Sequence, residues 1–240
     1  MDIEPPSRKR RELLKQLSLI PVVAAGAAIA PASQSAAPQN TSPPPPTEPY
    51  RPTFFNAAEW ALVIAICDRL IPHDDIGPGA VEACVPEFLD RHMQTPYASG
   101  DIWYMQGPFV DAPAEFGYQG RLPLRDLLRV GLKAVDQVAA EQNAGRHFAD
   151  LEHADQEKLL KAVEKGEVEL EGISAKLFFS YFLGEVRNGY FADPRHGGNR
   201  NMGAWKMIGY PGMRADYLDW VEVRDKPYPL PPVDMSGRRG

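Results

Sequence analysis

The stretch ISAKLFFSYFLGEVRNGYF, residues 173 to 191, decides the fold class of this chain. It predicts a helix from Ile173 to about Asn188, with Gly189 as its stop, because it shows no strand alternation. Its aromatic side chains are expected to lie in the helix core; the alternative is burial against a second protein, since they occupy nearly every face. The residues concerned are Phe178, Phe179, Tyr181 and Phe182.

Four further helices are predicted on the N-terminal side of this one. Asn56 and Glu59 have the spacing of a capping box and open a helix that ends near Leu70, before Pro72. The other three are expected at residues 80–93, 123–143 and 154–165. No stretch combines strand alternation with hairpin turns. The predicted fold class is therefore all-α: a single helical domain with long ordered loops and proline-rich extended arms at both ends.

Three segments lack helical periodicity. Residues 94–121 are rich in Gly, Pro and aromatic residues and predict a long ordered loop, a kind of loop that is usually functional or packed on a partner. Residues 191–223 contain repeated glycines and predict a chain of turns pinned by aromatic residues. Residues 224–240 return to proline and charge and predict an extended tail, ordered only where it lies on another surface.

Residues 1–32 have the features of an export signal. Basic residues, among them Arg10 and Arg11, precede an apolar run from Leu17 to Ala30 that is shorter than the ~20 residues of a membrane-spanning helix. Cleavage is expected after Ala32, and no permanent transmembrane segment is expected. The paired arginines resemble the twin-arginine signal, which exports folded proteins. An ordinary secretory signal that contains two arginines is the alternative.

The remainder of the chain is expected to form one soluble domain. Residues 33–52 are polar and proline-rich and predict an extended linker, followed by the helical domain at residues 53–223. The formal net charge is −6, and removal of the basic signal makes the rest more acidic. An acidic domain argues against nucleic acid as a partner.

The search for a cofactor or disulfide yields few candidates. Cys67 and Cys84 are the two cysteines of the chain; they could form a disulfide with each other, stay free and buried, or bridge to another chain. No Cys-x-x-Cys-His, G-x-G-x-x-G or P-loop pattern is present. Proteins that are exported in the folded state often carry a cofactor. Because this chain has no cofactor-binding motif, the cofactor is expected in a partner subunit and none is expected in this chain.

Two other classes of function are alternatives. A free-standing periplasmic enzyme would use His73 with Asp74 and Asp75, which could recruit a cation, although a solvated turn is the simpler interpretation. His196 could be catalytic, but a polar turn is again simpler. A periplasmic binding module is the third hypothesis, and it has no support beyond solubility.

Two long motifs carry a family resemblance. DRLIPHDDIGPGAVEACVPEFLDRHM (68–93) and GYFADPRHGGNRNMGAWKMIGYPG (189–212), behind a twin-arginine leader, resemble the small third subunit of the gluconate 2-dehydrogenase family. This resemblance spans nearly all of residues 53–223. The family includes small subunits of membrane-bound, FAD-dependent sugar and sugar-acid dehydrogenases. The resemblance therefore implies a non-catalytic subunit that supports folding and export of an FAD-containing large subunit.

The same resemblance implies the rest of the complex. Expected partners are the FAD subunit, a multihaem cytochrome c subunit and the twin-arginine translocase, with FAD and haem c held by partners. The expected location is the periplasm, associated with the inner membrane through partner subunits. No catalytic, cofactor-binding or metal-binding residue is expected in this chain. The turn-forming or partner-facing positions are expected to be Pro194, His196, Gly197, Gly198, Asn199 and Trp205.

Two positions depart from the family pattern. Cys84 stands where the pattern has a glycine, and His196 stands where an aromatic residue commonly precedes Gly-Gly-Asn. Neither departure disturbs the order or spacing of the two motifs.

Overall fold

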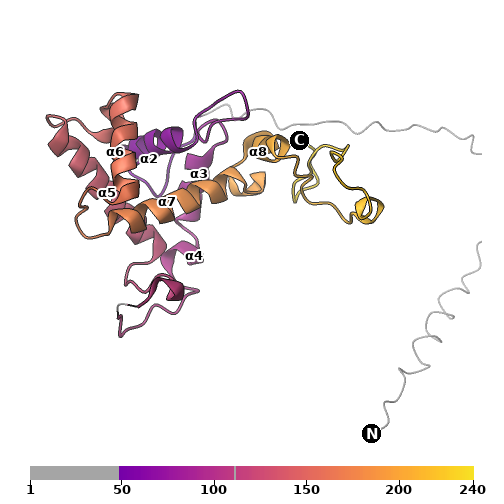
Figure 1. Cartoon of the computed structure of the whole chain (residues 1–240). Helices are drawn as coiled ribbons and strands as arrows, with labels where there is room; N and C mark the ends of the chain where they lie inside the picture. Colours follow the sequence, from indigo (N-terminus) through magenta and orange to yellow (C-terminus); the bar gives the residue numbers. More distant parts are fainter. Residues whose placement is uncertain (1–48, 111) are drawn as a thin grey trace, which may run out of the picture. The chain divides into compact units, whose positions relative to one another are not determined.

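A computed structural model describes residues 49–110 and 112–240 (Figure 1). Across these residues the secondary structure is helical, with seven α-helices and no strand, which confirms the all-α class. No helix in this part of the chain is both long and apolar enough to cross a bilayer. The predicted signal at 1–32, with Arg10 and Arg11, and most of the predicted linker at 33–52 lie outside the described residues.

Helix α2 spans Ala57–Leu70 and begins at the predicted cap. The Asn56 side chain accepts from the Glu59 backbone N–H at 3.0 Å, and the Glu59 carboxylate accepts from the Asn56 N–H at 3.0 Å. This reciprocal pair is a capping box, which satisfies two N–H groups that the first turn leaves without partners. The local sequence therefore fixes where α2 starts.

Helices α5 (Leu124–Gln142), α6 (His153–Lys165) and α7 (Ala175–Tyr190) complete the core with α2. Phe178 and Phe182 of α7 are buried, with ring centroids 5.6 Å apart. The α5 backbone approaches α7 closely at Gly131, where an added Cβ would lie 2.0 Å from the Phe178 ring. The aromatic run that predicted a helix is thus helix core, and all three predicted helices are present. The predicted stop at Gly189 is wrong, because Gly189 lies inside α7, where an added Cβ would lie 2.6 Å from the Phe88 ring.

Helix α3 spans Val85–His92 and is shorter than the helix predicted at residues 80–93. Its N-cap, Cys84, has φ +60°, and residues 80–84 form turns. A helix cannot continue through a residue in the left-handed region, so the N-terminal boundary of the prediction is wrong. A left-handed residue here also explains the glycine of the family pattern, because glycine adopts positive φ without steric cost.

The two predicted irregular segments hold short helical pieces. The segment at 94–121 contains α4, Pro96–Ser99, and a 3-10 turn at Ala114–Phe116. The segment at 191–223 contains α8, Gly203–Met207, and three 3-10 turns, Pro194–His196, Arg200–Met202 and Leu218–Trp220. The predicted chain of turns is confirmed, with α8 as an addition.

The C-terminal tail, residues 224–240, is ordered against the chain's own turn segment. The Met213 N–H donates to the Val233 carbonyl oxygen at 2.7 Å, and Val233 also pairs with Gly212 by a single bridge. The Met235 N–H donates to the Asp193 carboxylate at 2.8 Å. The tail was expected to be ordered only where it lies on another surface, and the turn segment of the same chain supplies that surface.

Candidate partner interface

The two motifs that carry the family resemblance contact each other directly. The Tyr190 hydroxyl donates to the Pro78 carbonyl oxygen at 2.6 Å, across 112 residues of sequence. The Arg200 backbone N–H donates to the Ala83 carbonyl oxygen at 3.1 Å. The motifs are therefore one structural unit, which we call the motif junction.

Unusual backbone conformations gather at the motif junction. Four non-glycine residues there have φ in the left-handed region, between +47° and +60°. They are Cys84, Asn199, Asn201 and Met202. Asparagine tolerates this region, whereas it costs the other residues about 1–2 kcal/mol each. Such strain persists only where the surrounding contacts fix the backbone, so the junction is tightly determined.

Asn199 holds the turn of the second motif from the inside. It is completely buried, and its Nδ2 donates to the Ala192 carbonyl oxygen at 2.9 Å. Its Oδ1 accepts from the Ala204 N–H at 2.9 Å. Both ends of the amide are thus bonded within the chain, as a buried polar group requires.

Trp205 and Gly198 are also internal. Trp205 is buried, and its indole Nε1 donates to the Phe191 carbonyl oxygen at 2.8 Å. At Gly198 an added Cβ would lie 2.0 Å from the Gly189 carbonyl oxygen, so no side chain fits. These contacts make both residues part of the packing of the turn.

The other three predicted positions reach the surface. Pro194 and His196 lie on one 3-10 turn, where His196 is exposed. Gly197 follows with φ +107°, and an added Cβ would lie 3.2 Å from the Arg91 guanidinium. A partner-facing role stays a prediction for these three residues.

The predicted His/Asp positions do not form a common site with one another. The His73 Nδ1 lies 2.9 Å from the Glu82 carboxylate, and both side chains are exposed. The Asp74 carboxylate accepts from the N–H groups of Ile76 and Gly77 at 2.8 and 3.0 Å, an Asx turn. Asp75 is exposed. Within the described ranges, no three His, Cys, Asp or Glu side chains are grouped closely enough to hold a metal.

Cys67 and Cys84 are both free and buried in this structure, and no disulfide joins them. Cys67 lies on α2 and is buried in the core, while the Cys84 thiol donates to the Glu82 carbonyl oxygen at 3.6 Å. Burial raises the pKa of Cys67 well above its usual range and that of Cys84 to about 12. Both thiols are therefore protonated, and unreactive, at neutral pH.

A buried acid on α7 was missed by the sequence patterns. The Glu185 side chain is 6% exposed, and its Oε2 lies 3.3 Å from the His92 Nε2 on α3. That contact lacks hydrogen-bond alignment, because Oε2 has no hydrogen-bond partner, whereas Oε1 accepts from the Asn188 amide at 3.2 Å. The sequence signal that could have predicted this buried acid is the presence of an acidic residue within the apolar run that forms α7.

The protonation of this pair follows from its surroundings. Burial raises the pKa of Glu185 to about 7, although the Asn188 hydrogen bond opposes the shift. Burial, with a smaller contribution from the charge of His196, lowers the pKa of His92. Both shifts disfavour the charged forms, so at pH 7 a neutral imidazole faces an acid that is about half protonated, and the contact is not an ion pair.

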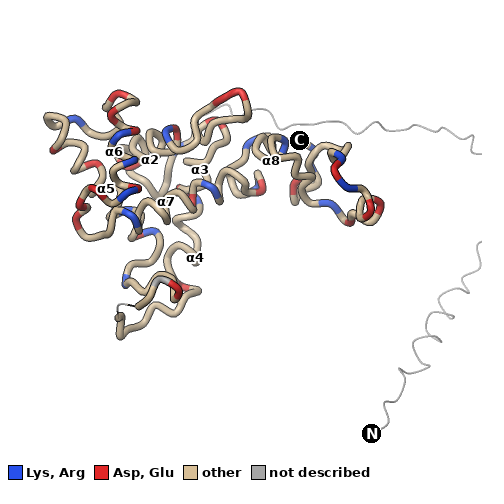
Figure 2. The backbone as a smooth tube through the Cα atoms, viewed as in Figure 1, with Lys and Arg blue, Asp and Glu red and all other residues tan. Residues whose placement is uncertain are grey.

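Exposed apolar side chains concentrate on residues 96–116, which we call the aromatic loop. Figure 2 shows few charged residues on this loop around α4. Six of its large apolar side chains are exposed: Tyr97, Ile102, Trp103, Tyr104, Val110 and Phe116. A concentration of large exposed apolar side chains within one loop is typical of binding sites.

A second exposed apolar set lies between residues 208 and 235, and we call it the C-terminal set. Its members are Ile208, Tyr210, Met213, Tyr217, Leu218, Val221, Val223, Leu230 and Met235. Figure 2 shows Lys, Arg, Asp and Glu interspersed along the same segment. Mixed charge distinguishes this set from the aromatic loop.

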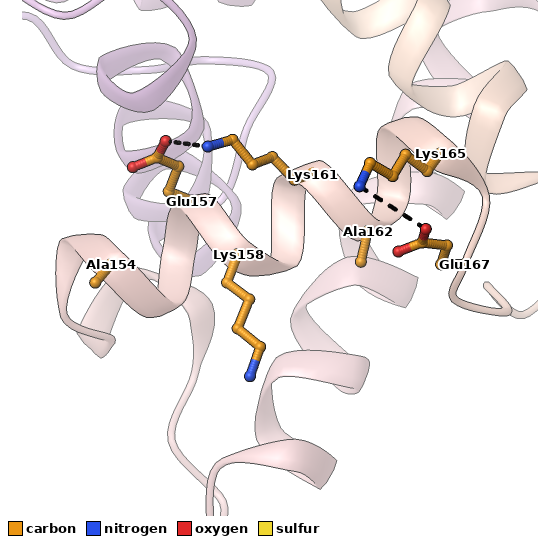
Figure 3. A pocket seen from close by; sticks show the side chains of 7 residues that line it. All are labelled: Ala154, Glu157, Lys158, Lys161, Ala162, Lys165 and Glu167. Carbon is orange, nitrogen blue, oxygen red and sulfur yellow. Dashed lines mark hydrogen bonds and ion pairs between the residues drawn. The ribbon is translucent and has the colours of Figure 1, made fainter.

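The surface depression drawn in Figure 3 follows the outer face of α6. Lys161 pairs with Glu157 at 2.6 Å, and Lys165 lies 3.9 Å from Glu167. Figure 3 also shows Lys158 pointing away from both pairs. Exposed pairs of opposite charge, four residues apart as for Glu157 and Lys161 or at the helix end as for Lys165 and Glu167, are ordinary on the solvated face of a helix. The depression shares no residue with the two motifs.

Comparison with known proteins identifies the family. A family model described as gluconate 2-dehydrogenase subunit 3 matches residues 57–212, a range that contains the whole of both motifs. The chain belongs to the gluconate 2-dehydrogenase subunit 3 family. Members are subunits of a multi-subunit dehydrogenase, so partner chains are implied. Comparisons with curated proteins and with solved structures gave no match.

Proposed function

We propose that this chain is the non-catalytic small subunit of a periplasmic FAD-dependent sugar or sugar-acid dehydrogenase. In this proposal it binds the flavoprotein subunit in the cytoplasm, supports its folding and takes it through the twin-arginine translocase. A multihaem cytochrome c subunit then completes the complex at the inner membrane. The observation that carries the proposal is the family match over residues 57–212.

Two further observations support it. The paired Arg10 and Arg11 precede a short apolar run, as in signals that export folded proteins. The aromatic loop and the C-terminal set expose large apolar side chains, which a partner subunit would cover. FAD and haem c belong to the partners in this proposal.

The export role is tested with a charge-conserving change in the leader. The double variant Arg10→Lys/Arg11→Lys should leave the flavoprotein subunit in the cytoplasm, because the twin-arginine route requires the arginine pair and not positive charge alone. The measurement is dehydrogenase activity and flavoprotein content of the periplasmic fraction in cells that coexpress both subunits.

Arg8→Lys is the matched control, since it changes a neighbouring arginine and keeps the pair. It should export the flavoprotein like the unaltered chain. An active flavoprotein in the periplasm of the double variant would show that the pair is not the export signal. Periplasmic flavoprotein in cells that lack this chain altogether would exclude the carrier role.

A further inference from the structure

We propose that the aromatic loop is the surface that binds the flavoprotein subunit, and that it fits an apolar groove bordered by Lys and Arg side chains. The inference rests on the proposed function and adds the location and chemistry of the contact. It is carried by a chain of stacked rings beneath the loop, by the exposure of the loop's side chains and by its charge.

The rings continue from the core to the exposed face. The Phe88 and His92 rings of α3 are stacked, with centroids 5.1 Å apart, and His92 lies 5.3 Å from the Tyr97 ring. The Tyr97 ring then lies 5.2 Å from the Trp103 ring. The buried Glu185 contacts His92 from the other side. The aromatic side chains at the base of the loop are therefore held in place before any partner arrives.

Hydrogen bonds fix the same part of the loop. Trp103 Nε1 donates to the Tyr97 carbonyl oxygen at 3.2 Å, and the Ser99 hydroxyl donates to the Asp101 carboxylate at 2.6 Å. The Thr95 side chain caps α4 by accepting from the Ala98 N–H at 3.4 Å. Rigid aromatic side chains lose little conformational freedom on binding, and Trp and Tyr are the most frequent anchors of protein interfaces.

The apolar side chains beyond these anchors project into solvent. Tyr104 is 83% exposed and Phe116 is 70% exposed. Interface centres are depleted in charge and enriched in aromatic residues. The aromatic loop has this composition, whereas the C-terminal set alternates with charged residues.

The charge of the aromatic loop indicates which kind of partner binds it. Residues 92–121 contain three acids, Asp101, Asp111 and Glu115, and one basic residue, Arg121, whose guanidinium lies 5.7 Å from the centre of the Phe109 ring. An anionic lipid surface is bound by clusters of basic residues, and a single arginine among three acids does not form one. A second copy of the chain would bring like charges together, which is unfavourable. A protein groove with a basic border is the complementary surface, and the flavoprotein subunit is the partner that the proposed function supplies.

The test uses the full chain coexpressed with the flavoprotein subunit of the proposed complex. The double variant Ile102→Ala/Tyr104→Ala should weaken the complex at least tenfold, measured as the dissociation constant of the purified pair. Glu115→Lys should also weaken it and reduce its dependence on salt concentration. Ile76→Ala is the matched control, because its side chain is 76% exposed but lies outside both the aromatic loop and the C-terminal set. Thermal melting monitored by circular dichroism should be unchanged in all variants.

The outcomes separate this inference from the proposed function. Equal binding by the unaltered chain and the loop variants would overturn the inference and leave the proposed function standing. Failure of the unaltered chain to bind the flavoprotein would overturn both. Loop-dependent binding to phosphatidylglycerol vesicles, or a dimer of this chain that the loop variants abolish, would place a different occupant on the loop and overturn the inference.

Discussion

The Tyr50 hydroxyl donates a hydrogen bond to the Asp90 carboxylate at 2.8 Å, although 40 residues separate them. Asp90 is completely buried on α3, and its oxygens also accept from the backbone N–H groups of Thr53, Phe54 and Phe55, at 2.9 to 3.0 Å. One carboxylate thus holds the first described residues of the domain against α3. Burial favours protonation, yet these hydrogen bonds outweigh it and hold the pKa of Asp90 below its usual value.

Asp90→Ala should lower the free energy of unfolding by about 3 kcal/mol, because several buried N–H groups lose their acceptor. Tyr50→Phe is the matched smaller change and should cost about 1 kcal/mol. Chemical denaturation measures both. Since the folded pKa of Asp90 is depressed, its contribution is present above the unfolded value near 4 and is lost as the pH falls below it. An Asp90→Ala protein with the acid sensitivity of the unaltered chain would contradict this assignment.

Cys84→Gly should be more stable than Cys84→Ala by about 1 kcal/mol, because φ is +60° at this position and glycine adopts it freely. Both variants lack the thiol, so the effect of its loss cancels when their stabilities are compared. Ala65→Gly in the interior of α2 is the control, where glycine should instead cost about 1 kcal/mol. Thermal or urea unfolding gives the order, and a less stable Cys84→Gly would show that residue 84 is not left-handed in solution.

Glu185→Gln should stabilise the domain at pH 8 by about 3 kcal/mol, because the folded pKa near 7 lies well above the ordinary value of a glutamate. In the unaltered chain the stabilising contribution of the protonated acid is complete below pH ~4.5 and is lost as the pH rises through 7. The difference between the two proteins should therefore grow over this range. Urea denaturation at a series of pH values measures it, with exposed Glu171→Gln as the unchanged control. A constant difference would mean that Glu185 titrates normally.

Asp234→Ala should release the C-terminal tail. Asp234 is buried and accepts from the backbone N–H groups of Ser236 and Arg238, at 2.8 and 2.9 Å, which shapes the turn beside Val233. Trypsin should then cleave after Arg224 several-fold faster, as followed by mass spectrometry, while Asp219→Ala leaves the rate unchanged. Unaltered cleavage would mean that the tail is held by other contacts.

Local signals in the sequence predicted the parts of the fold that depend on neighbouring residues. The Asn56 and Glu59 pair fixed the start of α2 because both side chains bond within one turn. The aromatic run at 173–191 predicted α7 because Phe178 and Phe182 lie one turn apart on its buried side. The order and approximate limits of the main helices followed from such patterns.

The same local patterns could not predict features that depend on residues far apart in the sequence. The turn that shortens α3 is held by the hydrogen bond from the Arg200 N–H to Ala83, which no local window contains. The raised pKa of Glu185 comes from burial against α3, and the order of the tail comes from Val233 meeting Gly212. Of the positions predicted to be turn-forming or partner-facing, Asn199 and Trp205 are internal, because their polar groups bond to backbone oxygens within the same motif.

The hydrogen bond between Tyr190 and Pro78 also sets a limit on when this protein can fold. The first motif emerges from the ribosome more than a hundred residues before its partner, and Val233 reaches Gly212 later still. Domains fold as units once their chain is available. Residues 1–32, the proposed leader, are therefore synthesised long before the domain behind them can close, and a prematurely terminated chain would carry this complete segment on a domain that never becomes native. A route restricted to folded cargo would reject such a fragment.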